Sequence, residues 1–354
     1  MASVKRSGEN RRLKSTMKNI LIIRRDNIGD LVCTTPLIEG VKSAWPDANV
    51  YLLINTVSQD VVKNNPHIEN TFIYRKAKHR KKNESKFGVY LDRLKIFMRL
   101  RRIRFDAAIL ANPNPCVYSL RLAKMAGIKH IVGADTGDRA ISVPFRAADF
   151  IGEHQVERTF SYLSAISDKK LAIPPVRIWL SEQERQQAAH RFAGRSYSDG
   201  PVLAVHISSR SPKRRWPLER YVEIIQRHLA TGNGSAVIFW SPQGTLAPDD
   251  VGDEHRAEQV LAACDSERVS LYPTASVREL VAAFEHCERL LCSDGGQMHL
   301  ASAMNKKQVV LFGDTDSKVW HPWSGEYRIM QTPSGECADV SVDEVWQQLQ
   351  SLAD

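Results

Sequence analysis

The sequence lacks several patterns that would assign its class directly. None of its apolar runs approaches the roughly 20 residues that a membrane-spanning helix needs. The first expected strand, residues 19–23, is followed by one glycine, Gly29, in place of the three glycines of a dinucleotide-binding turn. The six cysteines form no CxxC pair and no cluster with histidine. These absences argue against a transmembrane protein, a nicotinamide oxidoreductase, a zinc site and a disulfide-rich secreted domain, and they favour a reducing cytoplasm.

The positive charge of the chain is concentrated in two segments. The net charge is +9, but residues 1–18 carry +5 and residues 75–104 carry +11, which leaves −7 for the remainder. A basic run of this kind is either a solvated surface or a site for a polyanion, such as nucleic acid, anionic lipid or a phosphorylated glycan. Residues 1–17 are polar and contain no apolar segment, so a basic disordered tail is expected there.

Strand and helix patterns alternate twice along the chain. Residues 19–23 and 50–54 are typical of buried parallel strands, and residues 31–45 between them have the pattern of one helix. A stiff Ile-Pro-Pro segment interrupts the alternation before it restarts. The pattern predicts an α/β protein with two Rossmann-like, doubly wound domains. The expected divisions are the tail 1–17, an N-terminal domain 18–172, a C-terminal domain 173–340, and a terminal helix in 341–354.

The strand ends are where a ligand is expected, because doubly wound domains bind at the carboxyl ends of their strands. Two such domains facing each other would place the site in the cleft between them. At the end of the first strand, Asp30 stands at the expected start of a helix. It is interpreted either as the N-cap of that helix or as a general base that faces the cleft.

Two further strand ends carry groups suited to phosphate. The segment after residues 202–206 contains Ser208, Ser209, Lys213 and Arg214. Hydroxyls that donate hydrogen bonds and cations that neutralise charge suit a diphosphate, although a solvated basic loop has the same composition. After residues 289–292, an acid and two glycines precede a helix, which predicts either an anion-binding corner or a simple tight turn. Its members are Asp294, Gly295 and Gly296, with His299 one helical turn further on.

A possible metal motif follows the last predicted strand. Asp314-Thr315-Asp316 imitates the Asp-x-Asp that holds a divalent cation in some sugar-nucleotide enzymes. The cations near residue 213 can already serve a diphosphate, so no metal ligand is predicted.

Taken together and in this order, these segments resemble glycosyltransferase family 9, the ADP-heptose:lipopolysaccharide heptosyltransferases, from about Met17 to Leu352. The matching positions are Ile28-Gly29-Asp30 with Thr34 and Pro36, His154 to Arg158, Lys213 to Pro217, Asp294-Gly295 with His299, and Phe312-Gly313 with Thr315 and Trp320. The resemblance implies a GT-B fold, in which two Rossmann-like domains face each other across the active site.

The resemblance also implies roles for individual residues. Asp30 matches the catalytic aspartate that takes the proton from the acceptor hydroxyl. Ser208 and Ser209 match the residues that hold the diphosphate, and Lys213, or else Arg214, matches the phosphate-binding lysine. The turn at Asp294, with His299, matches the contacts to the donor. The acceptor is expected to meet the basic segment through Arg75, Lys76, Lys78, Arg80, Lys81 and Lys82.

The function implied is an inverting, metal-independent transfer of heptose from ADP-heptose to a lipopolysaccharide core or a related glycan, with no cofactor. The expected partners are a nucleotide sugar and a phosphorylated or Kdo-containing glycolipid, and no nucleic acid. The enzyme is expected to be a cytoplasmic monomer, peripheral at the cytoplasmic face of the inner membrane. An acidic residue that often holds the nucleoside in the family has no match after residues 237–240. Another nucleotide sugar, or a capsule, O-antigen or small-molecule acceptor, therefore stays open. A non-enzymatic binder of nucleic acid or anionic membrane is the alternative from another class.

Overall fold

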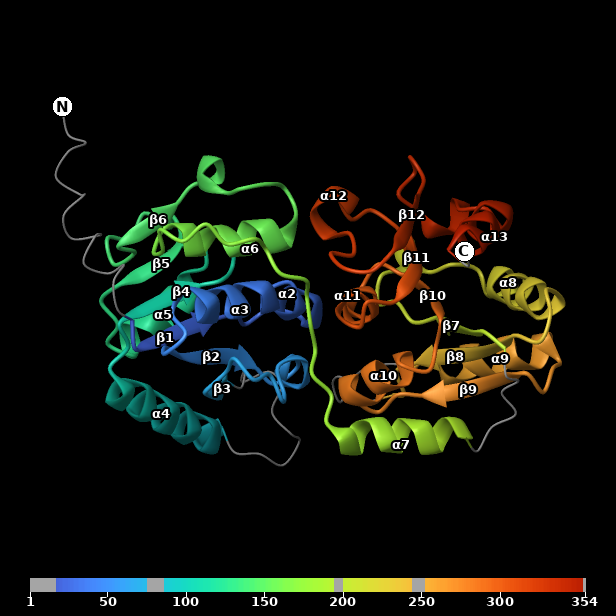
Figure 1. Cartoon of the computed structure of the whole chain (residues 1–354), viewed down its shortest axis with the longest axis horizontal. Coiled ribbons are helices and arrows are strands. Elements are labelled where there is room, and N and C mark those ends of the chain that lie inside the picture. The colour runs from blue at the N-terminus through green and yellow to red at the C-terminus, as the bar shows by residue number, and fades with distance from the viewer. Residues whose placement is uncertain (1–16, 75–85, 194–199, 244–251, 353–354) are drawn as a thin grey trace. The chain divides into compact units, whose positions relative to one another are not determined.

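The computed structural model describes residues 17–74, 86–193, 200–243 and 252–352. The chain divides into two compact units, unit 1 (Met1–Val176) and unit 2 (Arg177–Asp354) (Figure 1). Each unit contains one six-stranded parallel sheet with helices on both faces. None of the helices in the described part of the chain is long and apolar enough to cross a membrane.

The sheet of unit 1 has the strand order β3-β2-β1-β4-β5-β6, which is the 3-2-1-4-5-6 order of Rossmann-type sheets. Its central strand β1 pairs with β2 on one side and β4 on the other, and residues 20–23 are fully buried, as expected for a strand covered on both faces. The strands are β1 (Asn19–Ile23), β2 (Asn49–Asn55), β3 (Asn70–Tyr74), β4 (Ala107–Leu110), β5 (Ile131–Ala134) and β6 (Val143–Phe145).

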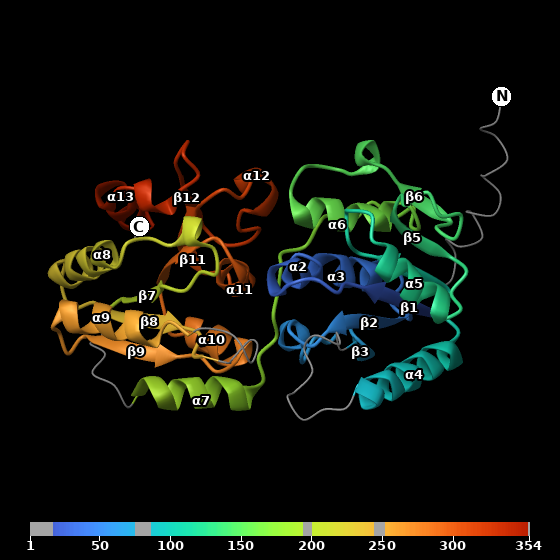
Figure 2. The same ribbon diagram turned by 180° about the vertical axis from the view of Figure 1, so that it is seen from behind.

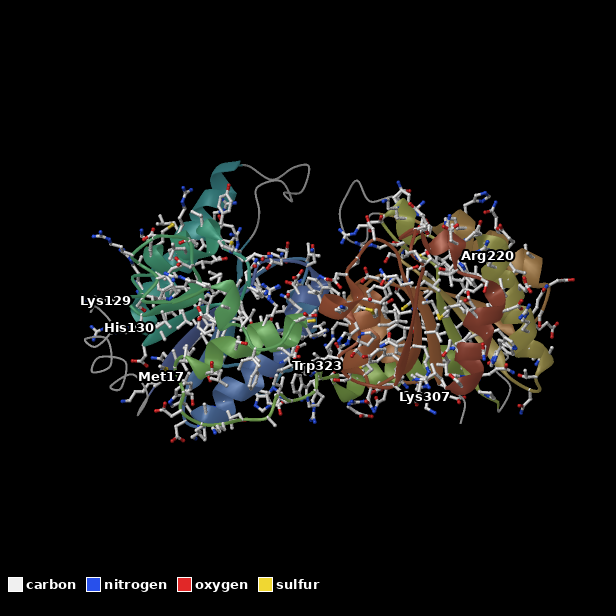
Figure 3. The ribbon with its side chains drawn as sticks, turned by 90° about the horizontal axis from the view of Figure 1, so that it is seen from above. Met17, Lys129, His130, Arg220, Lys307 and Trp323 are labelled. Atoms are coloured by element: carbon white, nitrogen blue, oxygen red, sulfur yellow. The ribbon has the colours of Figure 1, made fainter. Side chains whose placement is uncertain are left out.

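The helices of unit 1 form a layer on each face of this sheet (Figures 2 and 3). One layer holds α2 (Ile28–Val32), α3 (Thr35–Ala44) and α6 (Gln155–Ser164), and the other holds α4 (Lys86–Ile103) and α5 (Val117–Met125). Helices α3 and α6 pack closely because Gly40 has no side chain. A Cβ atom at Gly40 would lie 2.6 Å from Cε2 of Phe160.

Unit 2 repeats the topology with the order β12-β11-β10-β7-β8-β9, so its chain crosses over between β7 and β10. The strands are β7 (Val202–His206), β8 (Ser235–Trp240), β9 (Val269–Pro273), β10 (Arg289–Ser293), β11 (Lys307–Phe312) and β12 (Tyr327–Gln331). The helices are α7 (Glu182–Ala193), α8 (Leu218–Ala230), α9 (Glu254–Cys264), α10 (Val277–Phe284), α11 (Gly296–Ala303), α12 (Ser317–Trp320) and α13 (Val342–Ser351). The core on one face is formed with α8, α9 and α13.

The predicted α/β class with doubly wound domains is confirmed. The prediction of one helix over residues 31–45 is wrong, because α2 ends at Val32 and α3 begins at Thr35. Pro36 has no N–H to donate to the carbonyl of Val32, and the Thr35 hydroxyl donates to that oxygen instead, at 2.8 Å. Residues 57–65, where the apolar pattern before Pro66 favours a short helix, form only a 3₁₀ turn at Gln59–Val61. The terminal helix expected in residues 341–354 is α13, and it opens with a capping box in which Glu344 N–H donates to Ser341 Oγ at 3.3 Å.

Helix α7 is joined to α10 by a paired, nearly buried charge. Arg278 Nη2 lies 2.7 Å from Glu184 Oε2, and Arg278 Nε donates to Glu184 Oε1 at 2.9 Å. Arg278 Nη2 also donates to the carbonyl of Trp179 at 2.5 Å. These hydrogen bonds hold the pKa of the Glu184 carboxyl well below its usual range. The ionised carboxylate therefore stabilises the folded state.

We expect Glu184→Gln to lower the free energy of unfolding by about 3 kcal/mol at pH 7, because it leaves the guanidinium of Arg278 without its counter-charge. Since the folded-state pKa of Glu184 is depressed, its contribution is present above the unfolded-chain value of about 4.3 and is lost as the pH falls below it. Denaturant titrations at several pH values should show the difference between the two proteins narrowing below about pH 4. Glu182→Gln, an exposed change on the same helix, is the control. A difference that persists unchanged at low pH would contradict this account.

Candidate active site

Asp30 is held near the surface of unit 1, at the carboxyl end of β1. It is the third residue of α2, and its Oδ2 accepts a hydrogen bond from the backbone N–H of Asn27 at 3.0 Å. Asn27, not Asp30, is therefore the N-cap residue, so the N-cap interpretation of Asp30 is corrected. The Asp30 side chain retains 15% exposure, which leaves its carboxylate reachable by a hydroxyl.

The second oxygen of Asp30 is bound by Arg24, the first residue after β1. Arg24 Nη2 lies 2.5 Å from Asp30 Oδ1, and Arg24 Nε lies 3.1 Å from Asp26 Oδ2. The remaining amino group of the guanidinium donates to the carbonyl of Ala111, which follows β4. Arg24 is only 2% exposed, so this buried cation is paired with two carboxylates and one carbonyl. The arrangement fixes the direction of the Asp30 carboxylate.

Residues from further along the chain support this cluster. Asn112 Nδ2 donates to Asp26 Oδ2 at 3.0 Å, and Tyr162 Oη donates to the carbonyl of Asn112 at 2.8 Å. The Thr34 hydroxyl donates to the carbonyl of Asp30 at 2.8 Å. The carboxyl ends of two adjacent strands, β1 and β4, thus meet at Arg24, which binds the Asp30 carboxylate. A carboxylate so positioned can accept a proton from a hydroxyl group.

Cys33, one helical turn after Asp30, is not available as a nucleophile. It is buried, and burial together with the negative charge of Asp30 raises the pKa of its thiol far above the usual range. The thiol therefore stays protonated at neutral pH.

In unit 2 the predicted donor-binding residues follow two adjacent strands, β7 and β10. Ser208 and Ser209 follow β7 and are half-buried, and the Ser209 carbonyl accepts from Arg215 Nε at 2.9 Å. Lys213 is half-exposed, with Nζ 3.8 Å from Asp314 Oδ2 and 3.9 Å from Glu336 Oε1. At these distances its ammonium group is held only loosely.

Arg214 is held differently from Lys213. Its Nη1 lies 3.2 Å from Oδ2 of Asp294, whose side chain is only 5% exposed. The ion pair joins the loop after β7 to the end of β10. Close packing brings the same loop to Gly313, where a Cβ atom would lie 3.0 Å from both Arg214 Cγ and the Lys213 carbonyl. A side chain at Gly313 would therefore push both cations away.

The loop is anchored on its far side by Trp216, which is 1% exposed and donates from Nε1 to the Val340 carbonyl at 3.0 Å. Buried His206, at the end of β7, supplies no charge, because burial lowers its pKa to about 4. The loop carries four cations, Arg210, Lys213, Arg214 and Arg215, and the two predicted to bind phosphate are Lys213 and Arg214.

The glycine turn lies where α11 begins. Gly295 is the N-cap of α11 and Gly296 its first residue, so the N–H groups of the first helical turn begin at the end of β10. His299 is 5% exposed, and its ring meets Trp320 edge-to-face, with ring centroids 5.9 Å apart. His299 is therefore a packed side chain in this state, at the base of the turn.

The Asp-x-Asp segment does not form one pair. Asp314 faces the cations of the loop, with Oδ1 3.9 Å from Arg214 Nε, while Asp316 Oδ1 accepts from the N–H of Lys318 at the start of α12. Within the described residues no three His, Cys, Asp or Glu side chains are grouped as metal ligands.

The predicted acceptor residues Arg75, Lys76, Lys78, Arg80, Lys81 and Lys82 lie outside the described residues. The sequence analysis did not single out Arg24, Asn112 or Tyr162. Arg24 carried a signal, since an arginine directly after a buried strand has to be paired. Asn112 follows β4 just as Arg24 follows β1, but nothing in the sequence distinguished it.

Comparison with known proteins gives a consistent picture. A family model described as glycosyltransferase family 9 (heptosyltransferase) matches residues 93–348. Lipopolysaccharide heptosyltransferase 3 of Escherichia coli is 24% identical over 323 residues, which is 86% of this chain and 88% of the relative. Lipooligosaccharide heptosyltransferase 2 of Haemophilus influenzae is 24% identical over 333 residues, which is 91% of each chain.

Solved structures agree on the fold. A glycosyl transferase of family 9 from Veillonella parvula is similar with a TM-score of 0.78 at 18% identity, covering 96% of this chain and 97% of that one. The ADP-heptose lipopolysaccharide heptosyltransferase II of E. coli has a TM-score of 0.74 at 21% identity, covering 95% and 98%. The expected GT-B fold is thereby confirmed.

We expect Arg214→Gln to lower the free energy of unfolding of the full chain by about 2 kcal/mol, because Asp294 is left as a buried, unpaired carboxylate. The value lies below that for a fully buried pair because Arg214 is 31% exposed. Calorimetric unfolding measures it. Arg210→Gln, an exposed change in the same loop, should alter stability by less than about 0.5 kcal/mol. Equal stability of the two variants would show that the Arg214–Asp294 pair does not hold the loop.

Proposed function

The chain belongs to glycosyltransferase family 9, and on this premise we propose that it transfers a heptose from ADP-heptose to a lipopolysaccharide core or a related glycan. The chain is a glycosyltransferase, and we propose the identity of its sugar, its nucleotide and its acceptor. The relatives named above are heptosyltransferases that act on lipopolysaccharide or lipooligosaccharide. One of the similar structures is named for ADP-heptose.

The observation that carries the proposal is the arrangement at the ends of β7 and β10. Two serine hydroxyls, two cations and the first turn of α11 follow adjacent strands of one sheet. A nucleoside diphosphate needs these groups, since its negative charge increases as the sugar leaves. We propose that Ser208, Ser209, Lys213 and the turn at Asp294 bind the diphosphate of the donor. His299 would support that turn.

The proposed reaction is a direct displacement. The acceptor hydroxyl oxygen attacks the anomeric carbon, the bond from that carbon to the diphosphate oxygen breaks, and the diphosphate leaves with both electrons. Because the attack is a single displacement from the face opposite the leaving group, the configuration at the anomeric carbon is inverted. Asp30 takes the proton of the attacking hydroxyl. The ion pair with Arg24 supports this role because it fixes the direction of the carboxylate.

In this proposal the charge on the leaving diphosphate is balanced by Lys213, Arg214 and the helix N-terminus, without a metal ion or another cofactor. Unit 1 would bind the acceptor and unit 2 the donor. The protein would act as a monomer in the cytoplasm, at the face of the inner membrane where a phosphorylated or Kdo-containing glycolipid acceptor is found.

We expect Asp30→Asn to reduce transfer by about 10²–10⁴-fold, because the amide cannot accept the proton. ADP binding should stay nearly unchanged, because residue 30 lies in unit 1 and the proposed donor site in unit 2. Transfer is measured as acceptor-dependent release of ADP, and ADP binding by calorimetry on the same preparation.

Asp47→Asn, an exposed change in unit 1, is the matched control and should be fully active. Normal turnover by Asp30→Asn would remove Asp30 as the base. If Asp30→Asn loses both ADP binding and a cooperative unfolding transition, the substitution has disrupted the fold and not only the base.

We expect Lys213→Ala to weaken ADP binding about tenfold or more with little change in the melting temperature, because its ammonium group makes only loose contacts in the protein. Isothermal titration with ADP and with adenosine separates the diphosphate contribution from that of the nucleoside. Adenosine should bind both proteins equally. An ADP affinity that Lys213→Ala leaves intact would assign the phosphate contact to Arg214.

A further inference from the structure

Large apolar side chains are exposed at one place on unit 1. Six such side chains are exposed among the described residues, and five of them lie on α4 and α5. They are Leu94 (55% exposed), Met98 (47%), Val117 (49%), Tyr118 (68%) and Met125 (50%). We call the outer surface of these two helices the α4–α5 face. Apolar residues gathered in this way mark an interaction surface more often than single ones do.

The two helices are neighbours on the same side of the sheet (Figure 2). Phe97 and Leu100 of α4 and Leu120 of α5 are buried in one core cluster with strand residues of unit 1. Arg101 Nε donates to the carbonyl of Met125 at 3.0 Å, which joins the ends of the two helices. The exposed apolar side chains therefore lie on the outward side of the two helices and are not part of this core cluster.

The α4–α5 face is also strongly cationic. Residues 93–104 contain six Lys or Arg and no acid, and residues 117–130 contain Arg121, Lys124 and Lys129 and no acid. Lys95, Arg99 and Arg102 are exposed and follow helical spacing beside Leu94 and Met98. From a neighbouring loop, Asp138 pairs with Lys124 at 3.1 Å. Apolar residues bordered by cations on a helix are the signature of a segment that lies in the headgroup region of a bilayer.

We propose that the α4–α5 face docks on the surface of an anionic lipid bilayer. Leu94, Met98, Tyr118 and Met125 enter the boundary between headgroups and acyl chains, and the surrounding cations contact lipid phosphates. Nucleic acid would use the cations but would gain nothing from an aliphatic stripe, so the apolar residues favour a membrane.

Both helices connect this face with the edge of unit 1 that carries Asp30. Tyr74, at the end of β3, lies between two guanidinium groups, with Arg25 4.5 Å and Arg93 of α4 4.7 Å from its ring centroid. Arg25 belongs to the loop of Asp30. On the other helix, Val117 follows five residues after Asn112, which binds Asp26. If the acceptor is lipid-linked, docking through the α4–α5 face brings the acceptor to the edge of unit 1 that carries Asp30. This last inference rests on the proposed function.

The test is flotation of the full-length protein with vesicles of phosphatidylcholine containing about one third phosphatidylglycerol, at roughly 0.15 M salt. We expect the unmodified protein to float with these vesicles. The double variant Met98→Ser/Tyr118→Ser should bind at least tenfold more weakly, and Arg99→Glu/Arg102→Glu should bind more weakly still. Ile151→Ser, which changes the exposed apolar residue outside the face, and Lys170→Glu are matched controls that should bind like the unmodified protein.

Two results would overturn the proposal: no flotation of the unmodified protein, or full binding by Met98→Ser/Tyr118→Ser. Duplex DNA is also added as a competitor of the vesicles. If it displaces the unmodified protein and binds Met98→Ser/Tyr118→Ser equally well, the face is assigned to nucleic acid and the proposal is overturned. Transfer to a delipidated, water-soluble acceptor tests the proposed function separately. It should be unchanged in the serine variant, whereas an absence of transfer by the unmodified protein would contradict the function and not the docking face.

Discussion

The buried guanidinium of Arg24 is the interaction on which the reactive edge of unit 1 depends. A cation that is 2% exposed must be fully paired, and its partners are Asp26, Asp30 and the carbonyl of Ala111. These partners come from the loop after β1 and from the end of β4, so one charge ties two adjacent strands and the start of α2 together. The position of Asp30 follows from that requirement, and its 15% exposure leaves it open to an incoming hydroxyl.

An ion pair between an arginine and a buried carboxylate also positions a loop in unit 2. A buried carboxylate, Asp294, holds Arg214 and with it the loop after β7. Lys213 makes only contacts of 3.8 and 3.9 Å and can turn towards an anion at small cost. In both units the pair lies at the crossover point of the same strand order, where doubly wound sheets bind ligands. A fixed arginine beside a movable lysine suits the proposed binding and release of a diphosphate.

Much of the fold could be predicted from alternating apolar runs, because long buried strands such as β1 and β10 stand out from their surroundings. Strands β5, β6, β9 and β12 were not predicted. Strands β5 and β6 have only four and three residues, and β6 contains Pro144. Strands β9 and β12 lie at the sheet edges and are only partly buried. Asp30, Lys213 and the turn at Asp294 were predicted as site residues because they follow strong strands. Arg24 was not, because its decisive partner, the Ala111 carbonyl, is 87 residues away. The resemblance preferred Lys213 to Arg214 only by its spacing from the serines, and their different carboxylate partners give the physical distinction between them.

We propose that the carboxyl ends of β7 and β10 in unit 2 hold a sugar attached to ADP. A donor screen tests it most directly: thermal shift and hydrolysis are measured for the full chain with ADP-heptose and with other ADP-, UDP- and GDP-sugars. The account predicts that ADP-heptose gives the largest shift and the fastest acceptor-dependent release of nucleotide. A clear preference for a UDP-sugar in both measurements would contradict it.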